Sequence, residues 1–417
     1  MFIHRNIATE IFDALSTSPI VLLNGARQTG KSTLVKWVAQ QRQFEYVTLD
    51  DFTVLEAVLR DPIGYLSAFN RALIIDEVQK APQLFPALKQ LVDQNRIPGR
   101  FLLTGSANIF MLPKLSESLA GRIEIITLWP FSWDELLARK GRLIDALFAE
   151  HFEMIHDEVF SRADFLLWLM NGGYPEIQTL PSERRKNAWF NSYLTTILQR
   201  DVKDISRIES VHELPRLLAL IAAQSGSLFN MSSLSRDAGL VTMTLKRYIS
   251  LLEATFIVKR LPAWFKNIGK RLIKAPKMYL NDTGLLSYLI GVDQQRLKRD
   301  PQIVGRLFEN YVMQELFKQA SWSHVQPKIY YYRSTAGREV DFVLENRAGE
   351  IVGIEAKAAA TVTSSDFSGI IELQNLSGKA FKRGIVLYSG HQTVPFGNNR
   401  LAVPVSALWK VNAAQEF

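Results

Sequence analysis

A glycine-rich loop between a short apolar run and a helical pattern constrains the fold of this chain more than any other feature. Residues 25–32 read Gly-Ala-Arg-Gln-Thr-Gly-Lys-Ser, and the apolar residues 20–23 come just before them. Leu34, Val35 and Val38 begin a helical pattern directly after them. A strand, such a loop and a helix N-terminus together let backbone N–H groups and the helix dipole converge on phosphate oxygens. The sequence therefore predicts a phosphate-binding loop in an α/β fold with a mostly parallel sheet.

We expect this loop and the start of the helix to bind the phosphates of a nucleotide. In this role Lys31 would reach the β- and γ-phosphates, and the Ser32 hydroxyl would bind Mg²⁺. Glycine-rich loops also precede helices in many α/β folds, so the pattern alone leaves a chance match open. The expected nucleotide-binding residues are Gly25, Ala26, Arg27, Gln28, Thr29, Gly30, Lys31, Ser32 and Thr33.

A second apolar run ends in two carboxylates, as the partner strand of a phosphate loop should. Residues 71–75 lead into Asp76 and Glu77. We expect Asp76 to hold hydrated Mg²⁺ beside Ser32, and Glu77 to polarise the attacking water. An ordinary buried strand often ends in one acidic residue, but the adjacent pair is more specific. Because the chain has no Asn-Lys-x-Asp signature for guanine, ATP is the expected nucleotide, and Glu77 favours hydrolysis over phosphate transfer to a small acceptor.

Two further residues follow or precede predicted strands of the same region. The strand-like residues 101–103 lead into Thr-Gly-Ser-Ala-Asn, so we expect Ser106 to sense the γ-phosphate, with Asn108 in reserve; a simple turn is the alternative. Arg122 lies directly before the apolar run 123–128. There it would stabilise transition-state charge on ATP bound by a neighbouring subunit, which implies a homo-oligomer. The alternative is a surface arginine that caps a turn.

The composition limits the remaining classes of protein. The 417 residues suffice for two or three domains, and 47% are hydrophobic, but no uninterrupted apolar run reaches the roughly eighteen residues that cross a bilayer. The chain has no cysteine, its six histidines are dispersed, and its N-terminus lacks the apolar segment of a signal peptide. We therefore expect a cytoplasmic protein without a membrane partner, disulfides, or a cysteine or histidine metal site. The net charge of +8 is compatible with a polyanionic partner without requiring one.

The pattern becomes mostly helical after about residue 160. Apolar residues recur at helical spacing in residues 214–221 and again in 245–252, and residues 234–240 between them read as a short helix closed by glycine. With the extended residues 256–258, these helices predict a winged helix-turn-helix.

The stretch from Phe256 to Leu280 carries seven basic residues and no acidic one, with Trp264 and Phe265 among them. Such a stretch is typical of an arm that contacts the phosphate backbone of DNA. A contact to protein and a merely solvated hairpin are the alternatives. The basic residues are Lys259, Arg260, Lys266, Lys270, Arg271, Lys274 and Lys277.

The segment after about residue 300 contains a second constellation of charged residues. Asp341 and Glu355 fall at the facing ends of two strands of a predicted hairpin, and Lys357 shares the face of Glu355 by period-two alternation. Two carboxylates can hold Mg²⁺, and an adjacent ammonium can orient or deprotonate a bound water. Glu309, on an otherwise apolar helix, would supply a further carboxylate. This pattern predicts a phosphodiester-cleaving site; an exposed hairpin with salt bridges is the alternative.

Taken together, the chain resembles the bacterial and archaeal AAA-type ATPases whose C-terminal region joins a winged helix to a PD-(D/E)XK nuclease-like fold. The resemblance covers nearly the whole chain. It implies ATP hydrolysis with Lys31, Ser32, Asp76, Glu77 and Ser106 in the roles given above, and Arg122 acting across a subunit boundary. It also implies metal binding by Glu309, Asp341 and Glu355 with Lys357 in hydrolysis, although many nuclease-like domains cleave nothing. The motifs that carry it are residues 25–32, 73–77, 103–106, 119–122, the Gly-Gly-Tyr-Pro-Glu loop 172–176, Asp341 and residues 355–357.

This resemblance divides the chain into an AAA-type ATPase domain (residues 1–160), a helical and winged-helix domain (161–300) and a nuclease-like α/β domain (301–417). The principal hypothesis is an ATP-hydrolysing, DNA-associated enzyme that uses Mg²⁺. The alternative is an ATP-dependent regulatory or scaffold switch whose nuclease-like domain is inactive and binds protein. A toxin-like or defence role is a third hypothesis, which no residue identifies or excludes.

Overall fold

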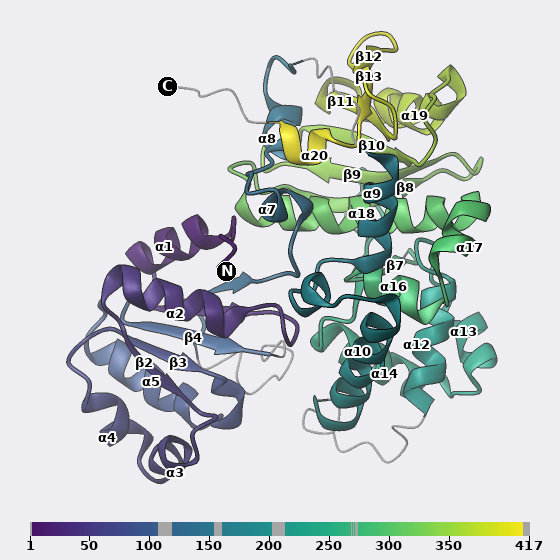
Figure 1. Cartoon of the computed structure of the whole chain (residues 1–417). Coiled ribbons are helices and arrows are strands. Elements are labelled where there is room, and N and C mark those ends of the chain that lie inside the picture. The colour runs from purple at the N-terminus through teal and green to yellow at the C-terminus, as the bar shows by residue number, and fades with distance from the viewer. Residues whose placement is uncertain are drawn as a thin grey trace. The chain divides into compact units, whose positions relative to one another are not determined.

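The computed structural model describes residues 2–106, 119–153, 161–201, 213–267, 269, 271 and 274–411. The chain forms two compact units: unit 1 comprises Met1–Phe131 with Ser250–Ile257, and unit 2 comprises Ser132–Ile249 with Val258–Phe417 (Figure 1). The C-terminal sheet and most of the helical segment belong to unit 2, but Ser250–Ile257 of the helical segment belong to unit 1. The division into three domains therefore stays a prediction.

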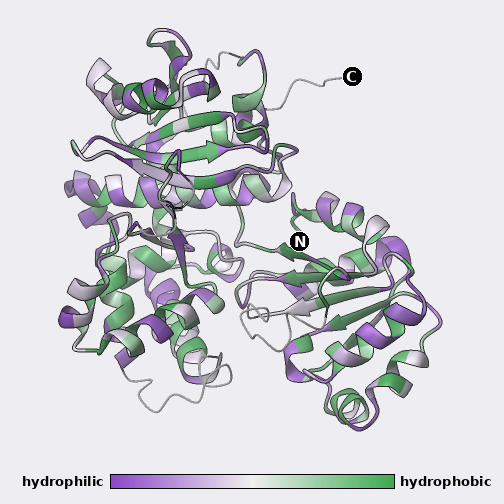
Figure 2. Cartoon of the chain, turned by 180° about the vertical axis from the view of Figure 1, so that it is seen from behind, coloured by the Kyte–Doolittle hydropathy of each residue, from purple (hydrophilic) through white to green (hydrophobic). Residues whose placement is uncertain are grey.

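Unit 1 contains a five-stranded sheet in the order β2-β3-β4-β1-β5, and every neighbouring pair is parallel. The central strands are buried on both faces, which explains their nearly continuous apolar sequences. Figure 2 shows this hydrophobic character along the strands. The predicted mostly parallel α/β sheet is confirmed. The strands are β1 (Ile20–Asn24), β2 (Glu45–Thr48), β3 (Leu73–Asp76), β4 (Phe101–Gly105) and β5 (Ile123–Thr127).

Helices connect these strands and bury apolar side chains against the sheet. Leu84, Phe85 and Leu88 of α5 belong to the same core cluster as Ile75 and Leu103 of the sheet. Parallel strands require such crossover helices, because the chain must return to the same edge before each new strand. The helices of unit 1 are α1 (Ala8–Thr17), α2 (Lys31–Arg42), α3 (Phe52–Arg60), α4 (Pro62–Ser67), the 3₁₀ turn η1 (Val78–Lys80) and α5 (Leu84–Gln94).

The helical part of the chain belongs to unit 2 except for Ser250–Ile257. It contains a two-stranded antiparallel sheet, in which Val258 pairs with Leu280. Leu217 and Ile221 are buried, as their helical spacing predicted. Gly239, at φ +70°, ends the short helix after Ala238. The elements are α7 (Trp133–Leu136), α8 (Leu143–Phe148), α9 (Arg162–Asn171), η3 (Glu176–Thr179), α10 (Glu183–Thr196), the π-helical turn η4 (Ile197–Asp201), α12 (Leu214–Ala223), α13 (Met231–Ala238), α14 (Thr242–Ala254), β6 (Val258–Leu261), β7 (Lys277–Leu280), α16 (Thr283–Leu289) and α17 (Gln294–Arg299).

The second part of unit 2 is a six-stranded mixed sheet in the order β12-β13-β11-β10-β9-β8. Strands β8 to β10 form an antiparallel meander, whereas β10, β11 and β13 are parallel. The long helix α18 runs along one side of this sheet and α19 lies on the other (Figure 1). The elements are α18 (Pro301–Trp322), β8 (Lys328–Arg333), β9 (Glu339–Glu345), β10 (Ile351–Lys357), η6 (Ser364–Phe367), α19 (Ser368–Ser377), η7 (Gly378–Ala380), β11 (Phe381–Tyr388), β12 (Val394–Pro395), β13 (Arg400–Pro404) and α20 (Ala407–Lys410).

Candidate functional site

The glycine-rich loop connects β1 to the N-terminus of α2, as its flanking sequence predicted. Gly25 must be glycine because its φ is +147° and a Cβ there would lie 2.2 Å from the Leu128 carbonyl oxygen. Gly30 adopts the left-handed conformation immediately before α2, at φ +95°. The backbone of the loop therefore sits at a helix N-terminus, where its N–H groups and the helix dipole favour an anion.

The predicted phosphate-binding lysine lies over its own loop. Lys31 is buried, and its Nζ donates to the carbonyl oxygens of Gly25 at 2.9 Å and Ala26 at 2.7 Å. The loop is braced from the N-terminal segment, because the buried Arg5 guanidinium donates to the Thr29 carbonyl at 2.9 Å. Arg5 is a site residue that the sequence analysis missed, since nothing in the local sequence of residues 2–7 relates it to the loop.

Asp76 ends β3 and is held by hydroxyl groups from both neighbouring strands. The Tyr46 hydroxyl on β2 donates to Asp76 Oδ2 at 2.7 Å, and the Thr104 hydroxyl on β4 donates to Asp76 Oδ1. Burial, followed by this hydrogen bond, raises the pKa of Tyr46 above its usual range. Both carboxylate oxygens are thus oriented by donors, and a buried carboxylate supplies the hard oxygen that Mg²⁺ prefers. Tyr46 was not predicted from the sequence.

Glu77 follows in a strained conformation that is fixed by its neighbours. It is left-handed, with φ +62°, and its backbone N–H donates to the Thr104 hydroxyl at 3.0 Å. The Gln79 side-chain amide donates to Glu77 Oε2 and also to the Ser106 hydroxyl, at 2.9 Å. Gln79 therefore joins the predicted base to the predicted γ-phosphate sensor. The reserve sensor, Asn108, lies outside the described residues.

Arg122 is paired within its own chain. Its Nη2 donates to Asp93 Oδ2 at 3.0 Å, and its Nη1 donates to the Ala120 carbonyl at 2.9 Å. The Arg122 guanidinium lowers the pKa of Asp93. These contacts are those of an arginine at a surface turn, and a role for Arg122 in trans stays a prediction.

The predicted carboxylates of the C-terminal sheet lie together. Ile354 of β10 pairs with Phe342 of β9, so Glu355 and Asp341 are the next residues along the two strands. Asp341 Oδ2 accepts a hydrogen bond from the Ala356 backbone N–H at 3.0 Å. Burial and then the nearby Asp341 charge raise the pKa of Glu309, on α18, to about 7, and the same two causes raise the pKa of Glu355 well above its usual range. We call Glu309, Glu339, Asp341 and Glu355 the carboxylate cluster.

Lys277 belongs to this cluster and not to a DNA-facing arm, which corrects the sequence interpretation of that residue. It is 2% exposed, and its Nζ lies 3.0 Å from Glu309 Oε1 and 3.1 Å from Asp341 Oδ1. Strand β7, on which it lies, is buried at every position. Trp264 is also 2% exposed, so its ring is core and not a base-stacking surface.

The other basic residues of that stretch differ in how far they are exposed. Arg271 forms two hydrogen bonds with Glu345, one of them 3.1 Å long, and its guanidinium lies 5.0 Å from the Tyr330 ring centroid. Lys259 lies over the Phe317 ring at 5.0 Å. Lys270 is outside the described residues. The exposed basic residues of the stretch are Arg260, Lys266 and Lys274.

Lys357 contacts a carboxylate outside the cluster. Its ammonium pairs with Asp366, which also accepts from the Thr363 backbone N–H at 2.6 Å. Although burial opposes the shift, the Lys357 ammonium and these hydrogen bonds lower the pKa of Asp366. Within the described ranges, no three His, Asp or Glu side chains meet in a group that could hold a metal ion. The role of Lys357 in hydrolysis therefore stays a prediction.

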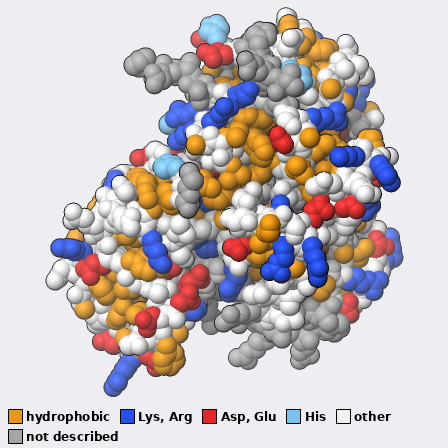
Figure 3. All heavy atoms as spheres, in the orientation of Figure 1, with side chains coloured by type: hydrophobic (Ala, Val, Ile, Leu, Met, Phe, Trp, Pro, Cys, Tyr) orange, Lys and Arg blue, Asp and Glu red, His pale blue; other side chains and the backbone are white. Residues whose placement is uncertain are grey.

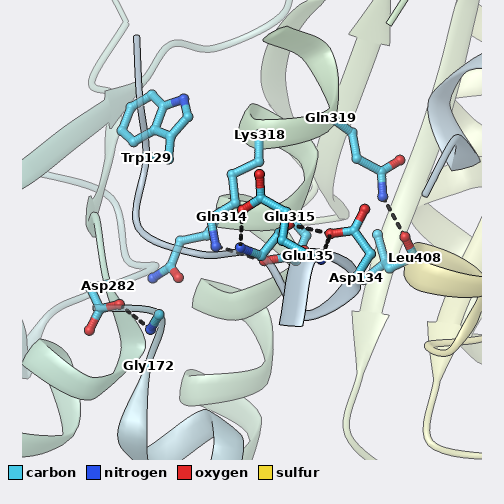
Figure 4. Close-up of polar contacts among 12 residues, drawn as sticks. Trp129, Asp134, Glu135, Gly172, Asp282, Gln314, Glu315, Lys318, Gln319 and Leu408 are labelled. Carbon is cyan, nitrogen blue, oxygen red and sulfur yellow. Dashed lines mark hydrogen bonds and ion pairs between the residues drawn. The ribbon is translucent and has the colours of Figure 1, made fainter. Parts of the chain in front are cut away.

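A second buried polar network was missed by the sequence analysis (Figure 4). Asp134 accepts from the Gly141 backbone N–H at 2.7 Å, and Lys318 Nζ donates to Glu315 at 2.8 Å. Burial and then the Glu315 charge raise the pKa of Asp134 to about 7. One local signal was available, because Ser132 and Glu135 form a capping box at the start of α7, with the spacing Ser-x-x-Glu.

The Gly-Gly-Tyr-Pro-Glu loop has a structural explanation. Gly172 adopts φ +71°, and a Cβ there would lie 2.2 Å from Asp282 Oδ1. The buried Asp282 carboxylate accepts from the Gly173 N–H at 2.7 Å and from the Leu285 N–H at 2.9 Å, at the start of α16. The loop thus fits closely against a helix N-terminus inside unit 2, and glycine is required by space and conformation.

The parallel sheet, the glycine loop ahead of α2 and the buried Asp76 define unit 1 as a P-loop domain of the AAA type. Three family models match the chain: an AAA domain over residues 17–137, a domain of unknown function (DUF8612) over residues 162–296, and a second one (DUF4143) over residues 304–408. Uncharacterized proteins from Mycobacterium tuberculosis and Mycobacterium bovis are each 32% identical over 417 residues, covering 99% of this chain and 86% of theirs. The chain belongs to the family of these two proteins.

Among solved structures, the chain is similar to a Walker-type ATPase of Pyrococcus abyssi, at 14% identity and a TM-score of 0.43, with 69% of this chain and 96% of that chain covered. In the part of the chain that the structure describes, no helix combines the length and apolar character of a membrane span.

Proposed function

We propose that unit 1 hydrolyses ATP, and that the network linking Asp76, Thr104, Glu77, Gln79 and Ser106 is the catalytic part of the site. The single observation that carries this proposal is the pair of Gln79 hydrogen bonds, which join Glu77, the predicted base, to Ser106, the predicted γ-phosphate sensor. Strands β1, β3 and β4 are parallel, so the loop and this network lie at the same edge of the sheet.

The roles follow from the chemistry of each group. The Lys31 ammonium would leave its loop carbonyls for the β- and γ-phosphates, and Ser32 and Asp76 would hold Mg²⁺, which neutralises phosphate charge when bound. Glu77 would accept a proton from water in line with the γ-phosphate, and Ser106 would donate to a γ-phosphate oxygen. Tyr46 and Thr104 orient Asp76 in advance, so no reorganisation is needed when charge develops.

ATP turnover in three variants tests this proposal. Lys31→Ala should lose ATP binding, whereas Glu77→Gln should retain binding and lose turnover, because it keeps the shape of the side chain and removes the base. Gln40→Ala, at an exposed position of α2, is the control. Turnover by Glu77→Gln at the wild-type rate would exclude Glu77 as the base.

We further propose that unit 2 engages DNA through a winged helix. The order α12, α13, α14 and the antiparallel pair β6–β7 supports this, as does the exposure of Arg247 on α14 together with Arg260, Lys266 and Lys274. On the face seen in Figure 3, basic and acidic side chains of the described residues are interspersed. DNA should raise ATP turnover, and binding should weaken steeply with salt.

The alternative is a regulatory or scaffold switch that binds protein through unit 2. Its specific support is the exposure of two apolar side chains at the start of α14, Val241 at 70% and Met243 at 77%. Lys266→Glu with Lys274→Glu should reduce DNA binding and leave a protein contact at α14 intact, whereas Met243→Asp should do the reverse. ATP turnover indifferent to DNA, with no salt-sensitive complex, would favour the scaffold.

The order of α18, β8, β9, β10, α19 and β11 supports a PD-(D/E)XK-like fold for the C-terminal part. The fold alone does not imply phosphodiester cleavage, because that activity depends on whether the carboxylate cluster binds a divalent cation. The Lys277 contacts bear directly on that point.

A further inference from the structure

One ammonium group lies at the centre of the carboxylate cluster. Lys277 Nζ lies 2.5 Å from Glu339 Oε1, 3.0 Å from Glu309 Oε1 and 3.1 Å from Asp341 Oδ1. An ammonium has three N–H donors, so these three contacts use all of them. Glu309 lies on α18, and Glu339 and Asp341 lie on β9. Lys277 lies on β7, 32 residues before Glu309 and 64 residues before Asp341 in the sequence.

The surroundings hold this arrangement in place. The Tyr279 hydroxyl, on the same strand as Lys277, donates to Glu309 Oε1 at 2.6 Å. The backbone of Gly226 closes in on Glu309, since a Cβ at Gly226 would lie 3.1 Å from Glu309 Oε1. A salt bridge as deeply buried as this one is favourable only when its charges lie close together and further hydrogen bonds satisfy the carboxylate oxygens.

The cluster contains its own cation. The Lys277 ammonium is buried and contacts three of the four carboxylates. The fourth, Glu355, lies outside these contacts, and its Oε2 atom has no hydrogen-bond partner among the described residues. Glu339 also lies 3.5 Å from the Arg333 guanidinium. The cluster thus resembles an internal ion-pair network more than a vacant anionic site.

We propose that the Lys277 ammonium occupies the position of the divalent cation in this cluster, so that the chain as folded binds no Mg²⁺ or Mn²⁺ there and does not cleave phosphodiesters. A divalent cation needs the same oxygens at shorter distances, together with several waters. It would have to displace a buried ammonium of like charge. The Lys357 ammonium, which would orient the attacking water, is likewise engaged by Asp366. This inference is independent of ATP hydrolysis by unit 1.

Mn²⁺ titration of the full-length, nucleotide-free protein, followed by the electron paramagnetic resonance of free Mn²⁺, tests the proposal. Wild type and Asp341→Asn should titrate identically, because neither has a site at the cluster. Lys277→Met, which keeps the length of the side chain without the charge, should gain one bound Mn²⁺. The double variant Lys277→Met with Asp341→Asn should lose that gain, and Lys277→Arg, which keeps the charge, should bind none.

Two results would overturn the proposal. One is Mn²⁺ binding by wild type that Asp341→Asn abolishes; the other is a folded Lys277→Met protein that gains no site. Where Lys277→Met does not fold, as judged by thermal unfolding, the comparison of wild type with Asp341→Asn decides alone. Plasmid nicking in Mn²⁺ gives a second readout: wild type and Asp341→Asn should not differ, and nicking that depends on Asp341 in wild type contradicts the inference.

Discussion

Replacing Gln79 with leucine tests the ATPase site most directly. Gln79→Leu keeps the approximate shape of the side chain and removes the amide that donates to Glu77 and Ser106. A hydrogen bond to a charged acceptor contributes about 1.5–3 kcal/mol, and one to a neutral hydroxyl about 0.5–1.5 kcal/mol. The two together therefore contribute about 2–4.5 kcal/mol to the positioning of the base and the sensor.

These energies convert to a loss in rate. About 1.4 kcal/mol corresponds to a factor of ten in rate. If the whole energy of the two hydrogen bonds stabilises the transition state, their removal lowers kcat by about 30-fold to about 2,000-fold. Gln79 is half-buried, so water can replace part of the interaction, and the expected loss lies at the lower end, at about 30-fold. The KM for ATP should change little, because the Gln79 amide donates to Glu77 and Ser106 and not to the phosphate loop.

Steady-state ATP hydrolysis at saturating Mg²⁺ measures both constants. Gln90→Leu, the same substitution at an exposed position of α5, is the matched control, and thermal unfolding confirms that both variants fold. An unchanged kcat, or a loss confined to KM, would refute a positioning role. An increase in kcat would show that Gln79 restrains Glu77 in an inactive position.

Three further predictions follow from single contacts. Tyr46→Phe removes one donor to Asp76 and should lower kcat about fivefold to tenfold, whereas wild-type turnover would show that Thr104 suffices. Gly172→Ala should lower the free energy of unfolding by more than about 1 kcal/mol in urea titrations, because its Cβ would meet Asp282 and φ is +71°. The pKa of Asp134 is raised from 3.8 to about 7 on folding, so its contribution to stability is present below pH 4 and is lost as the pH rises toward 7. Between about pH 4 and pH 7, the unfolding free energy of Asp134→Asn should therefore fall less than that of wild type. An equal fall in both proteins would show that another group causes it.

Much of the nucleotide site was predictable because its determinants are local. A strand, a glycine loop and a helix are contiguous in residues 20–42, and their geometry needs little from the rest of the chain. Asp76 and Glu77 could be predicted because parallel strands end at one edge of their sheet. Tyr46, Gln79 and Arg5 could not, since each has a side-chain contact with a segment that the sequence does not mark as a neighbour.

The C-terminal carboxylates were predicted for a similar reason, but the meaning of the cluster was not. The register of the predicted hairpin places Asp341 and Glu355 at the facing ends of neighbouring strands, and period-two alternation places Lys357 on the face of Glu355. The same alternation places Lys277 and Tyr279 on one side of β7, but it does not say whether that side faces solvent or core. The composition of residues 256–280 by itself favoured a basic arm, because unpaired lysines are usually exposed.

By itself, the amino-acid sequence determined the P-loop, the acidic strand end, the parallel α/β sheet of unit 1 and the helical stripes of unit 2. These depend on periodicity and on backbone conformations that glycine allows, which are properties of short segments. Only the tertiary structure decided which charged groups are partners. It brought Gln79 between Glu77 and Ser106, and it buried the Lys277 ammonium among three carboxylates. The physical reason is that the effect of a charge depends on its burial and on its neighbours in space, and packing of distant segments sets both.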